Sequence, residues 1–335
     1  MIIVTGGAGF IGSCLVAALS ARGLVPVVVD RLRSDGKWRN LRHHPPAQIV
    51  QPEDLDAFLA TAEDVEAIFH LGAVSATTAR DGDLVWKSNV ELSQKLWRFC
   101  TKTGARFIYA SSAATYGAAD KPDEFHDGLA NLERLEPMNL YGWSKHAFDL
   151  WAREEVEAGA APSQWAGLKF FNVYGPGEYH KGSMISVVKV KYDEVAAGNP
   201  ARLFRSDRSD LADGAQARDF VWVGDVVDVM LWLYDNRTVS GLFNLGTGIA
   251  RSYLDLAYAV CDAAGRPREV NFIDMPAALK GQYQSYTCAD MTQLRVAGYS
   301  RTFTSLEDGI RDYIRGYLMP GCDPWVKGWP LKTAD

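Results

Sequence analysis

Tyr141 and Lys145 are the residues of this sequence whose types and spacing point most directly to acid–base chemistry. A spacing of four residues puts both side chains on one face of a helix. An ammonium beside a phenol stabilises the phenolate and lowers the pKa of the tyrosine toward that of a working base. Ser112, at the end of a predicted strand, is expected to hydrogen-bond the substrate hydroxyl that Tyr141 deprotonates. A tyrosine and a lysine at this spacing also occur by chance. The secondary-structure elements and motifs around them therefore decide whether the pair belongs to an active site.

A glycine-rich segment follows the first predicted strand and opens the first predicted helix. Its sequence is Gly6-Gly7-Ala8-Gly9-Phe10-Ile11-Gly12. Glycines at such a junction allow a tight turn, close approach of backbone N–H groups to a pyrophosphate, and close packing of the helix on the strand. We therefore expect a dinucleotide cofactor here, bound by Gly6, Gly9, Phe10, Ile11 and Gly12.

Asp30 ends the second predicted strand, where a carboxylate can accept hydrogen bonds from the adenosine ribose hydroxyls. Alone it would favour NAD. The segment from Arg31 to Arg42 carries five basic residues against Asp35, and an ammonium or guanidinium there can pair with the 2′-phosphate of NADP. The sequence thus predicts NADP, held by Arg31 and Lys37. NAD, with the segment as a solvated loop, is the alternative.

The elements that would position these residues alternate between strand and helix. This alternation predicts βαβ units and a parallel sheet. The fold class is therefore α/β, a doubly wound parallel Rossmann sheet with a smaller mixed α/β substrate-binding lobe. Predicted strands are Ile2–Val4, Val27–Val29, Ile49–Val50, Ala67–Leu71, Arg106–Ala110 and Leu168–Phe171, and helices are predicted over Ser183–Ala197 and near Ser305–Leu318. We expect the Rossmann domain to span 1–172 and about 220–248, the lobe 173–219 and 249–318, and an irregular extension 319–335.

Composition excludes several function classes. The 35 basic against 41 acidic residues give a net charge of -6, which disfavours nucleic acid as the main partner. Five cysteines without a CxxC pair indicate reduced thiols and a cytoplasmic location. No apolar run approaches the roughly 18 residues of a membrane span, so no membrane partner is expected. The six histidines show no metal-ligand spacing, so no metal site is expected.

A set of motifs, in order along residues 1 to about 318, resembles the extended short-chain dehydrogenase/reductase superfamily of nucleotide-sugar enzymes. Beyond the glycine-rich segment and the Tyr141–Lys145 pair, the motifs are Ser112–Gly117, Asn172–Pro176, Arg218–Val221 and Asn244–Gly248. Within the superfamily, the ADP-L-glycero-D-manno-heptose 6-epimerases are most similar, through Ala110–Gly117, Asn172–Pro176, His180–Met184, Val223–Val226 and Gly281–Gln284.

The resemblance implies an NADP-dependent epimerase of a nucleotide sugar, with ADP-heptose as substrate, in the biosynthesis of lipopolysaccharide precursors. It implies a carbon inverted by transient oxidation and re-reduction, and a homo-oligomer. Tyr141, Lys145 and Ser112 would be catalytic, and Lys181 resembles a second acid/base opposite the tyrosine. Leu71, Gly72, Ala73 and Asn89 would join Tyr141 and Lys145 in lining the cofactor. The substrate would be held by Ser112, Asn172, Lys181, Ser183, Phe204, Arg218 and Tyr283.

Some residues depart from the family's pattern. Gly177 and Gln282 stand where the family usually has arginine, and Leu71 where an acidic residue is common. Two positive charges near a diphosphate site are therefore missing, which leaves a 4-epimerase or another oxidoreductase of a different nucleotide sugar as an alternative. Dehydration is disfavoured because Ala113 and Ala114 replace the acidic residues it needs. A non-catalytic dinucleotide-binding protein is disfavoured because the tyrosine and the lysine are both present.

Overall fold

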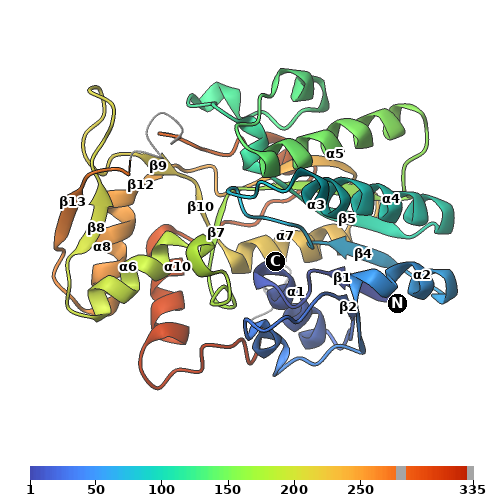
Figure 1. Cartoon of the computed structure of the whole chain (residues 1–335), viewed down its shortest axis with the longest axis horizontal. Helices are drawn as coiled ribbons and strands as arrows, with labels where there is room; N and C mark the ends of the chain where they lie inside the picture. The colour runs from blue at the N-terminus through green and yellow to red at the C-terminus, as the bar shows by residue number, and fades with distance from the viewer. Residues whose placement is uncertain (277–283, 330–335) are drawn as a thin grey trace.

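The computed structural model describes residues 1–276 and 284–329, and its largest element is a seven-stranded parallel sheet (Figure 1). The strand order is β11-β6-β5-β4-β1-β2-β3. The strands are β1 (Ile2–Thr5), β2 (Val27–Val29), β3 (Gln48–Val50), β4 (Ala67–His70), β5 (Arg106–Ser112), β6 (Trp165–Phe170) and β11 (Gly241–Leu245). All six predicted strands are present in it, and the predicted doubly wound α/β fold is confirmed.

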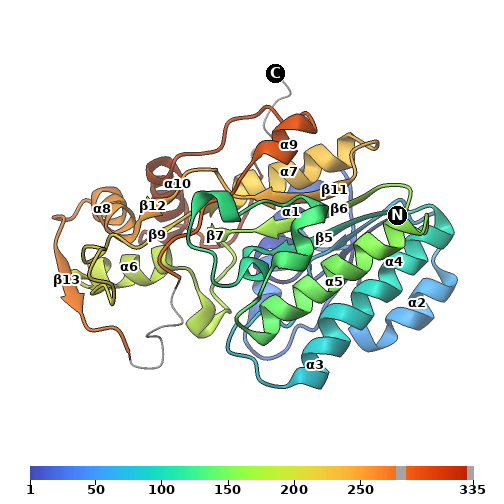
Figure 2. The same ribbon diagram turned by 90° about the horizontal axis from the view of Figure 1, so that it is seen from above.

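Helices cover both faces of this sheet, which explains why its strands are apolar on consecutive residues. One face packs against α1 (Phe10–Ala21) and α7 (Val223–Asp235). The other packs against α2 (Leu55–Thr61), α4 (Leu92–Thr103) and α5 (Leu140–Glu157), as the view from above shows (Figure 2). A short helix α3 (Gly82–Trp86) runs through a π-helical turn, Lys87–Glu91, into α4.

In the residues that the structure describes, the second lobe is built from three two-stranded sheets and three helices. Its strand pairs are β7 (Asn172–Tyr174) with β10 (Phe220–Trp222), β8 (Ala201–Phe204) with β13 (Val270–Ile273), both parallel, and β9 (Ala217–Arg218) with β12 (Arg251–Ser252), antiparallel. Its helices are α6 (Val187–Ala196), α8 (Tyr253–Ala264) and α10 (Leu306–Tyr313), which share one apolar core, while α9 (Thr292–Val296) lies near β11. The proposed domain limits remain a prediction.

Helix α6 begins later than the sequence predicted. Residues 182–184 form a 3₁₀ turn, and Ser186 caps the helix by accepting a hydrogen bond from the Lys189 N–H. The Ser186 N–H and hydroxyl both donate to the buried carboxylate of Glu178, 2.7 and 2.6 Å away. The segment that contains Lys181 is therefore a turn fixed at both ends, not the first turn of a helix.

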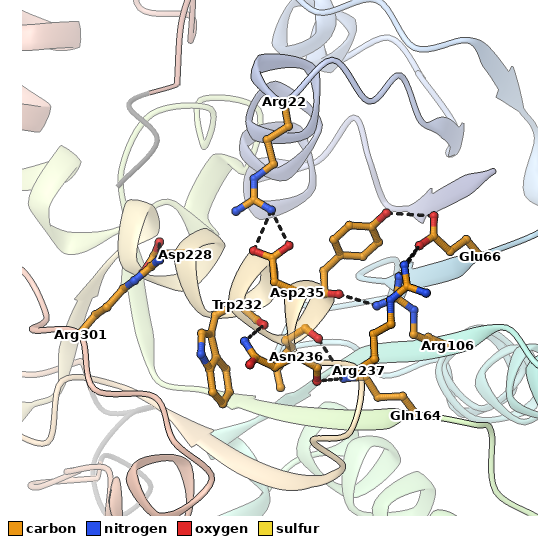
Figure 3. A network of polar contacts seen from close by, with 12 residues as sticks. Arg22, Glu66, Arg106, Gln164, Asp228, Trp232, Asp235, Asn236, Arg237 and Arg301 are labelled. Atoms are coloured by element: carbon orange, nitrogen blue, oxygen red, sulfur yellow. Dashed lines mark hydrogen bonds and ion pairs between the residues drawn. The ribbon is translucent and has the colours of Figure 1, made fainter. Parts of the chain in front are cut away.

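A polar network ties the amino-terminal edge of the sheet to the end of α7 (Figure 3). The Arg106 guanidinium, at the start of β5, donates to the Tyr234 carbonyl and to the Glu66 carboxylate. The Gln164 amide, just before β6, donates to the carbonyls of Leu233, Asn236 and Val239, each at 2.9 Å. Because these contacts lie at the strands' amino ends, the carboxyl ends are left for other contacts.

The described part of the C-terminal extension packs on the body of the protein. Val326 is buried in the main core, and the Trp325 ring lies edge-on to Tyr179 at 5.2 Å. The His43 imidazole contacts the Asp323 carboxylate at 3.0 Å. All five cysteines are unpaired thiols. Among the described residues, no helix is both long and apolar enough to cross a bilayer.

Candidate active site

The glycine-rich segment lies between β1 and α1, beside the loop that follows β4. These two strands are neighbours at the point where the sheet's winding reverses, which is where open α/β sheets bind nucleotides. Gly6 has a φ of +68°, and a Cβ there would lie 2.7 Å from the Gly72 nitrogen. A Cβ on Gly12 would lie 2.2 Å from the Gly6 carbonyl oxygen. A side chain at either position would collide with the backbone, so only glycine lets this turn pack closely against the loop after β4 and against α1. The compact turn leaves backbone N–H groups at the start of α1 to meet a pyrophosphate.

Asp30 lies at the edge of this cradle, with its carboxylate already placed by the backbone. It accepts hydrogen bonds from the N–H groups of Ala8, at 2.9 Å, and Arg31, at 2.8 Å. The Lys37 ammonium pairs with the same carboxylate at 2.7 Å, and both side chains are about nine-tenths buried. Asp30 and Lys37 therefore form one unit, and the structure brings these two predicted cofactor residues together.

Arg31 points elsewhere. Its guanidinium pairs with the exposed carboxylate of Glu53, with 2.8 Å between Nε and Oε1. The Glu53 carboxyl has a pKa below its usual range because of this arginine. Arg31 would have to leave Glu53 to reach a phosphate, whereas Lys37 is already turned toward the ribose position.

Ser112 and Tyr141 meet at the carboxyl end of β5. The Ser112 hydroxyl accepts a hydrogen bond from the Ala114 N–H at 3.1 Å, and the Ser112 side chain also lowers the pKa of the Tyr141 phenol. Asn139 caps α5 through the Gly142 N–H. A Cβ on Gly142 would lie 2.5 Å from the Ala114 carbonyl oxygen, so only glycine allows α5 to approach this turn. The glycine after Tyr141 thus sets the distance between tyrosine and serine.

Lys145 lies one helical turn from Tyr141, as its spacing predicted. Its ammonium is buried and donates to the Ala110 carbonyl at 2.7 Å. Burial lowers the pKa of Lys145 to about 8. Burial raises the pKa of Tyr141, and the Ser112 side chain lowers it. Burial dominates at Tyr141, so the lowered pKa expected from the spacing to Lys145 is not found here, while Lys145 itself titrates near physiological pH.

His70 ends β4 under the same site and is neutral. Its Nδ1 is 2.6 Å from the Thr5 hydroxyl, and its Nε2 is 2.9 Å from the Ser93 hydroxyl. The Ser93 hydroxyl donates to the Asn89 carbonyl, so Nε2 carries the proton and Nδ1 accepts from Thr5. Burial lowers the pKa of His70 to about 3. Thr5 in turn accepts from the Gly72 N–H, which connects the histidine to the cofactor loop.

Lys181 lies over Phe10, a residue of the glycine-rich segment. Its Nζ is 5.3 Å from the centre of the Phe10 ring, a cation–π contact. Burial lowers the pKa of Lys181, and the Glu178 carboxylate opposes that change. The structure thus brings Lys181 from the second lobe to the cofactor cradle on the first.

The predicted substrate residues lie along the second lobe. Asn172 and Ser183 are exposed, Phe204 is half-buried at the end of β8, and Arg218 is buried on β9. The Arg218 guanidinium donates to the carbonyls of Ala217 and Gln284 and lies over the Tyr253 ring. Tyr283 lies outside the described residues. The next residue, Asp219, accepts from the N–H groups of Thr247, Gly248 and Ala289, so it joins two of the sequence motifs.

Comparison with known proteins agrees with this geometry. Residues 2–246 match the family described as the NAD dependent epimerase/dehydratase family. The chain belongs to that family. An ADP-L-glycero-D-manno-heptose-6-epimerase of Nitratidesulfovibrio vulgaris (strain DP4) is 48% identical over 330 residues, which are 97% of this chain and 100% of the relative. The predicted class of enzyme, a nucleotide-sugar epimerase, is confirmed.

Two solved structures extend the comparison. A Helicobacter pylori ADP-L-glycero-D-manno-heptose-6-epimerase superposes with a TM-score of 0.76 and 28% identity, covering 94% of each chain. A Thermus thermophilus UDP-glucose 4-epimerase in complex with NAD superposes with a TM-score of 0.71 and 27% identity, covering 94% of this chain and 99% of that one. The description of the family and this neighbour both support a nicotinamide dinucleotide as the class of cofactor. The homo-oligomer and the cytoplasmic location stay predictions.

Asn89 has a different contact pattern from the one expected for a cofactor ligand. Its amide accepts from the Val74 N–H at 2.8 Å, and donates to the Val74 carbonyl at 3.0 Å and to the Ser144 hydroxyl at 2.9 Å. It is fully buried in the π-helical turn before α4. In this epimerase Asn89 holds the loop after β4, and its direct contact with cofactor stays a prediction.

Asn40 is a residue of the epimerase site that sequence reasoning missed. Its buried amide nitrogen lies 3.0 Å from the Ala8 carbonyl oxygen, 2.9 Å from the Gly177 carbonyl oxygen and 3.4 Å from His180 Nδ1. It therefore links the glycine-rich segment to the turn that carries Lys181. The only signal in the sequence was an asparagine within the basic segment from Arg31 to Arg42. Asp149 and Lys169 were also missed, although an acid on an apolar helix face and a lysine within an apolar strand were visible.

Proposed function

We propose that the chain is an NADP-dependent ADP-D-glycero-D-manno-heptose 6-epimerase. The observation that carries this proposal is the meeting of Ser112, Tyr141 and Lys145 at the sheet edge beside the dinucleotide cradle, with Lys181 reaching the cradle from the other lobe. The 48% identical relative and the Helicobacter pylori structure, both named as ADP-heptose 6-epimerases, support the choice of substrate.

Tyr141 is the proposed acid/base of the first half-reaction. A dinucleotide held by the glycine-rich segment and the Asp30–Lys37 pair would supply reversible hydride transfer at the carbon to be inverted. Ser112, whose side chain acts on the Tyr141 phenol, orients the substrate hydroxyl. Tyr141 takes the hydroxyl proton as the carbonyl forms. The buried Lys145 ammonium keeps the phenolate available for that transfer.

Lys181 is the proposed acid/base of the second half-reaction. Inversion needs re-reduction on the opposite face of the carbonyl, and one tyrosine can serve both steps only if the oxygen returns to it. Lys181 comes from the opposite lobe, is largely buried, and has a lowered pKa that suits proton exchange. Its contact with Phe10 at the start of α1, with Tyr141 in the first turn of α5, supports separate roles for the two residues.

NADP, rather than NAD, is the proposed cofactor. The Lys37 ammonium beside Asp30 can pair with a 2′-phosphate while Asp30 keeps its two backbone donors. Because an acid that is already neutralised does not repel that phosphate, the pair favours the phosphorylated ribose.

Substituting Lys181 tests the assignment of roles. Lys181→Met should block epimerisation of ADP-D-glycero-D-manno-heptose, because the second proton transfer is lost, and should leave the affinity for ADP within about threefold. Lys189→Met, a lysine of α6 that pairs with Asp193 at the surface, is the matched control and should epimerise at the parent rate. When the 6-aldehyde form of the substrate is supplied instead, the products show which half-reaction each variant retains. Parent-rate epimerisation by Lys181→Met contradicts the assignment.

A further inference from the structure

A fully buried ion pair lies directly beneath the acid–base site. The Lys169 ammonium of β6 is 3.0 Å from the Asp149 carboxylate of α5, and neither side chain has any solvent exposure. Lysine and aspartate are almost never fully buried unless they are paired, and removing two charges from water costs several kcal/mol per ion. Apolar side chains of similar volume would fill this space at lower cost. The position of the pair suggests a role beyond filling the core.

The pair holds the end of β5. Asp149 accepts hydrogen bonds from the Tyr109 hydroxyl at 3.0 Å and the Ser111 hydroxyl at 2.6 Å. Lys169 donates to the Thr115 hydroxyl at 2.7 Å, and that hydroxyl donates to the Ser112 carbonyl at 2.8 Å. The backbone of Ser112 is thus braced on both sides by partners of the same ion pair.

Helix spacing brings the charge of Asp149 close to the catalytic residues. Tyr141, Lys145 and Asp149 follow one another at intervals of four, so they lie on one face of α5. The Asp149 carboxylate raises the pKa of Tyr141 and opposes the lowering of the pKa of Lys145. At His146, burial lowers the pKa most, the Lys169 ammonium lowers it further and the Asp149 carboxylate raises it, so both charges act in this region.

We propose that Asp149 and Lys169 are positioning residues of the epimerase, which fix the strand end that carries Ser112 and set the electrostatic field at Tyr141 and Lys145. This inference rests on the proposed function in one respect, the role of Tyr141 as acid/base. It assigns the pair no contact with substrate or cofactor.

Several other titratable groups face this cluster and must be held constant in a test. They are Tyr109 on β5, Tyr116 after it, His70 on β4, Asp127 in the loop before α5, and His146 and Arg153 on α5. None of them is altered in the variants below.

Opposite charge removals should move the pH profile in opposite directions. Asp149→Asn removes the anion, so Lys145 loses its proton more easily. The fall of kcat at alkaline pH, the alkaline limb, reports the loss of that proton and should move to lower pH. Lys169→Met removes the cation and moves that limb to higher pH. A unit charge about 6–10 Å away at an effective dielectric constant of about 20 corresponds to a shift of roughly one to two pH units. A purely structural role would lower stability in both variants and would move neither limb.

A second readout needs no substrate. The ultraviolet titration of tyrosinate, taken as the difference between each variant and the same variant carrying Tyr141→Phe, follows the ionisation of Tyr141 alone. It should move downward in Asp149→Asn and upward in Lys169→Met. Because this titration does not depend on turnover, it tests the pair even if the proposed substrate is wrong.

The double variant and a distant control complete the experiment. Asp149→Asn with Lys169→Met restores local neutrality and should return both readouts toward those of the parent. If one of the single variants does not fold, the other single variant can be compared with the double variant. The difference between these two measures the effect of the charge that the unfolded variant was meant to remove. Asp225→Asn changes a buried carboxylate in the first turn of α7 that accepts hydrogen bonds from the Thr304 N–H and hydroxyl, and it should lose stability without a pH shift. The proposal is overturned if the alkaline limbs of kcat in the two single variants move in the same direction, or if neither moves.

Discussion

Replacing Lys37 by glutamine should convert a preference for NADP into a preference for NAD. Lys37 is the cation already placed at the ribose position, 2.7 Å from the Asp30 carboxylate and largely buried. Glutamine keeps most of the side chain's length and removes the charge. Asp30 retains the N–H groups of Ala8 and Arg31 as donors, so its carboxylate stays in place for a ribose hydroxyl.

The size of the effect follows from the kind of bond that is lost. A hydrogen bond to a charged group contributes about 1.5–3 kcal/mol, so the affinity for NADP should fall about 10- to 150-fold. The affinity for NAD should change by less than about threefold, because NAD presents no phosphate to Lys37. Arg31→Gln is the matched control, and it should lower NADP affinity only slightly because Arg31 is paired with Glu53.

Calorimetric titration of both dinucleotides into dinucleotide-free protein measures these affinities, and circular dichroism confirms that each variant is folded. The loss of NADP affinity should shrink at high salt, since the interaction is electrostatic. An equal loss of NAD and NADP affinity in Lys37→Gln would show that Lys37 supports the fold of the loop and does not select the phosphate. Unchanged NADP affinity would refute the assignment altogether.

Three further predictions concern catalysis and stability. Tyr141→Phe should lower epimerisation about 10²–10⁴-fold with dinucleotide affinity nearly intact, as measured by turnover and calorimetry, and ordinary turnover would contradict the mechanism. Asp219→Ala should cost at least about 3 kcal/mol in urea unfolding, because the N–H groups of Thr247, Gly248 and Ala289 lose a buried acceptor, and a loss below about 1 kcal/mol would be inconsistent. His70 has a folded pKa of about 3, below its unfolded value, so its contribution to stability is present above about pH 6.5 and is lost as the pH falls toward 3. The parent should therefore lose about 1.4 kcal/mol more than His70→Gln between pH 7.5 and 5.5, and equal losses in urea unfolding would argue against a neutral buried histidine.

Much of the fold could be predicted because its signals are local. The run of three valines at 27–29 coincides with β2, and the glycines after β1 mark the start of α1. The start of α6 could not be located, because Ser183 and Ser186 are both good caps and only the contact of Ser186 with the Glu178 carboxylate, which the sequence does not reveal, favours Ser186. The partner of β10 was also not predictable, because pairing with β7 depends on contacts between distant segments.

In the candidate site too, local signals could be found from the sequence and contacts between distant segments could not. Tyr141 and Lys145 could be found because a spacing of four residues on a helix is enough to put the phenol and the ammonium on one face. Asn40 could not, because its importance comes from the three groups its amide contacts, and those belong to different loops. Arg31 and Lys37 were equivalent in sequence, and only the ion pairs with Glu53 and Asp30 distinguish them.

The most direct test of the proposed function is to incubate the purified protein, loaded with NADP, with ADP-D-glycero-D-manno-heptose and to follow the configuration at carbon 6 by NMR. UDP-glucose and UDP-N-acetylglucosamine serve as parallel substrates. The proposal predicts conversion to the L-glycero epimer, no inversion of the UDP-sugars, and loss of the conversion in Tyr141→Phe. Inversion at carbon 4 of a UDP-sugar, with the heptose unchanged, would contradict it.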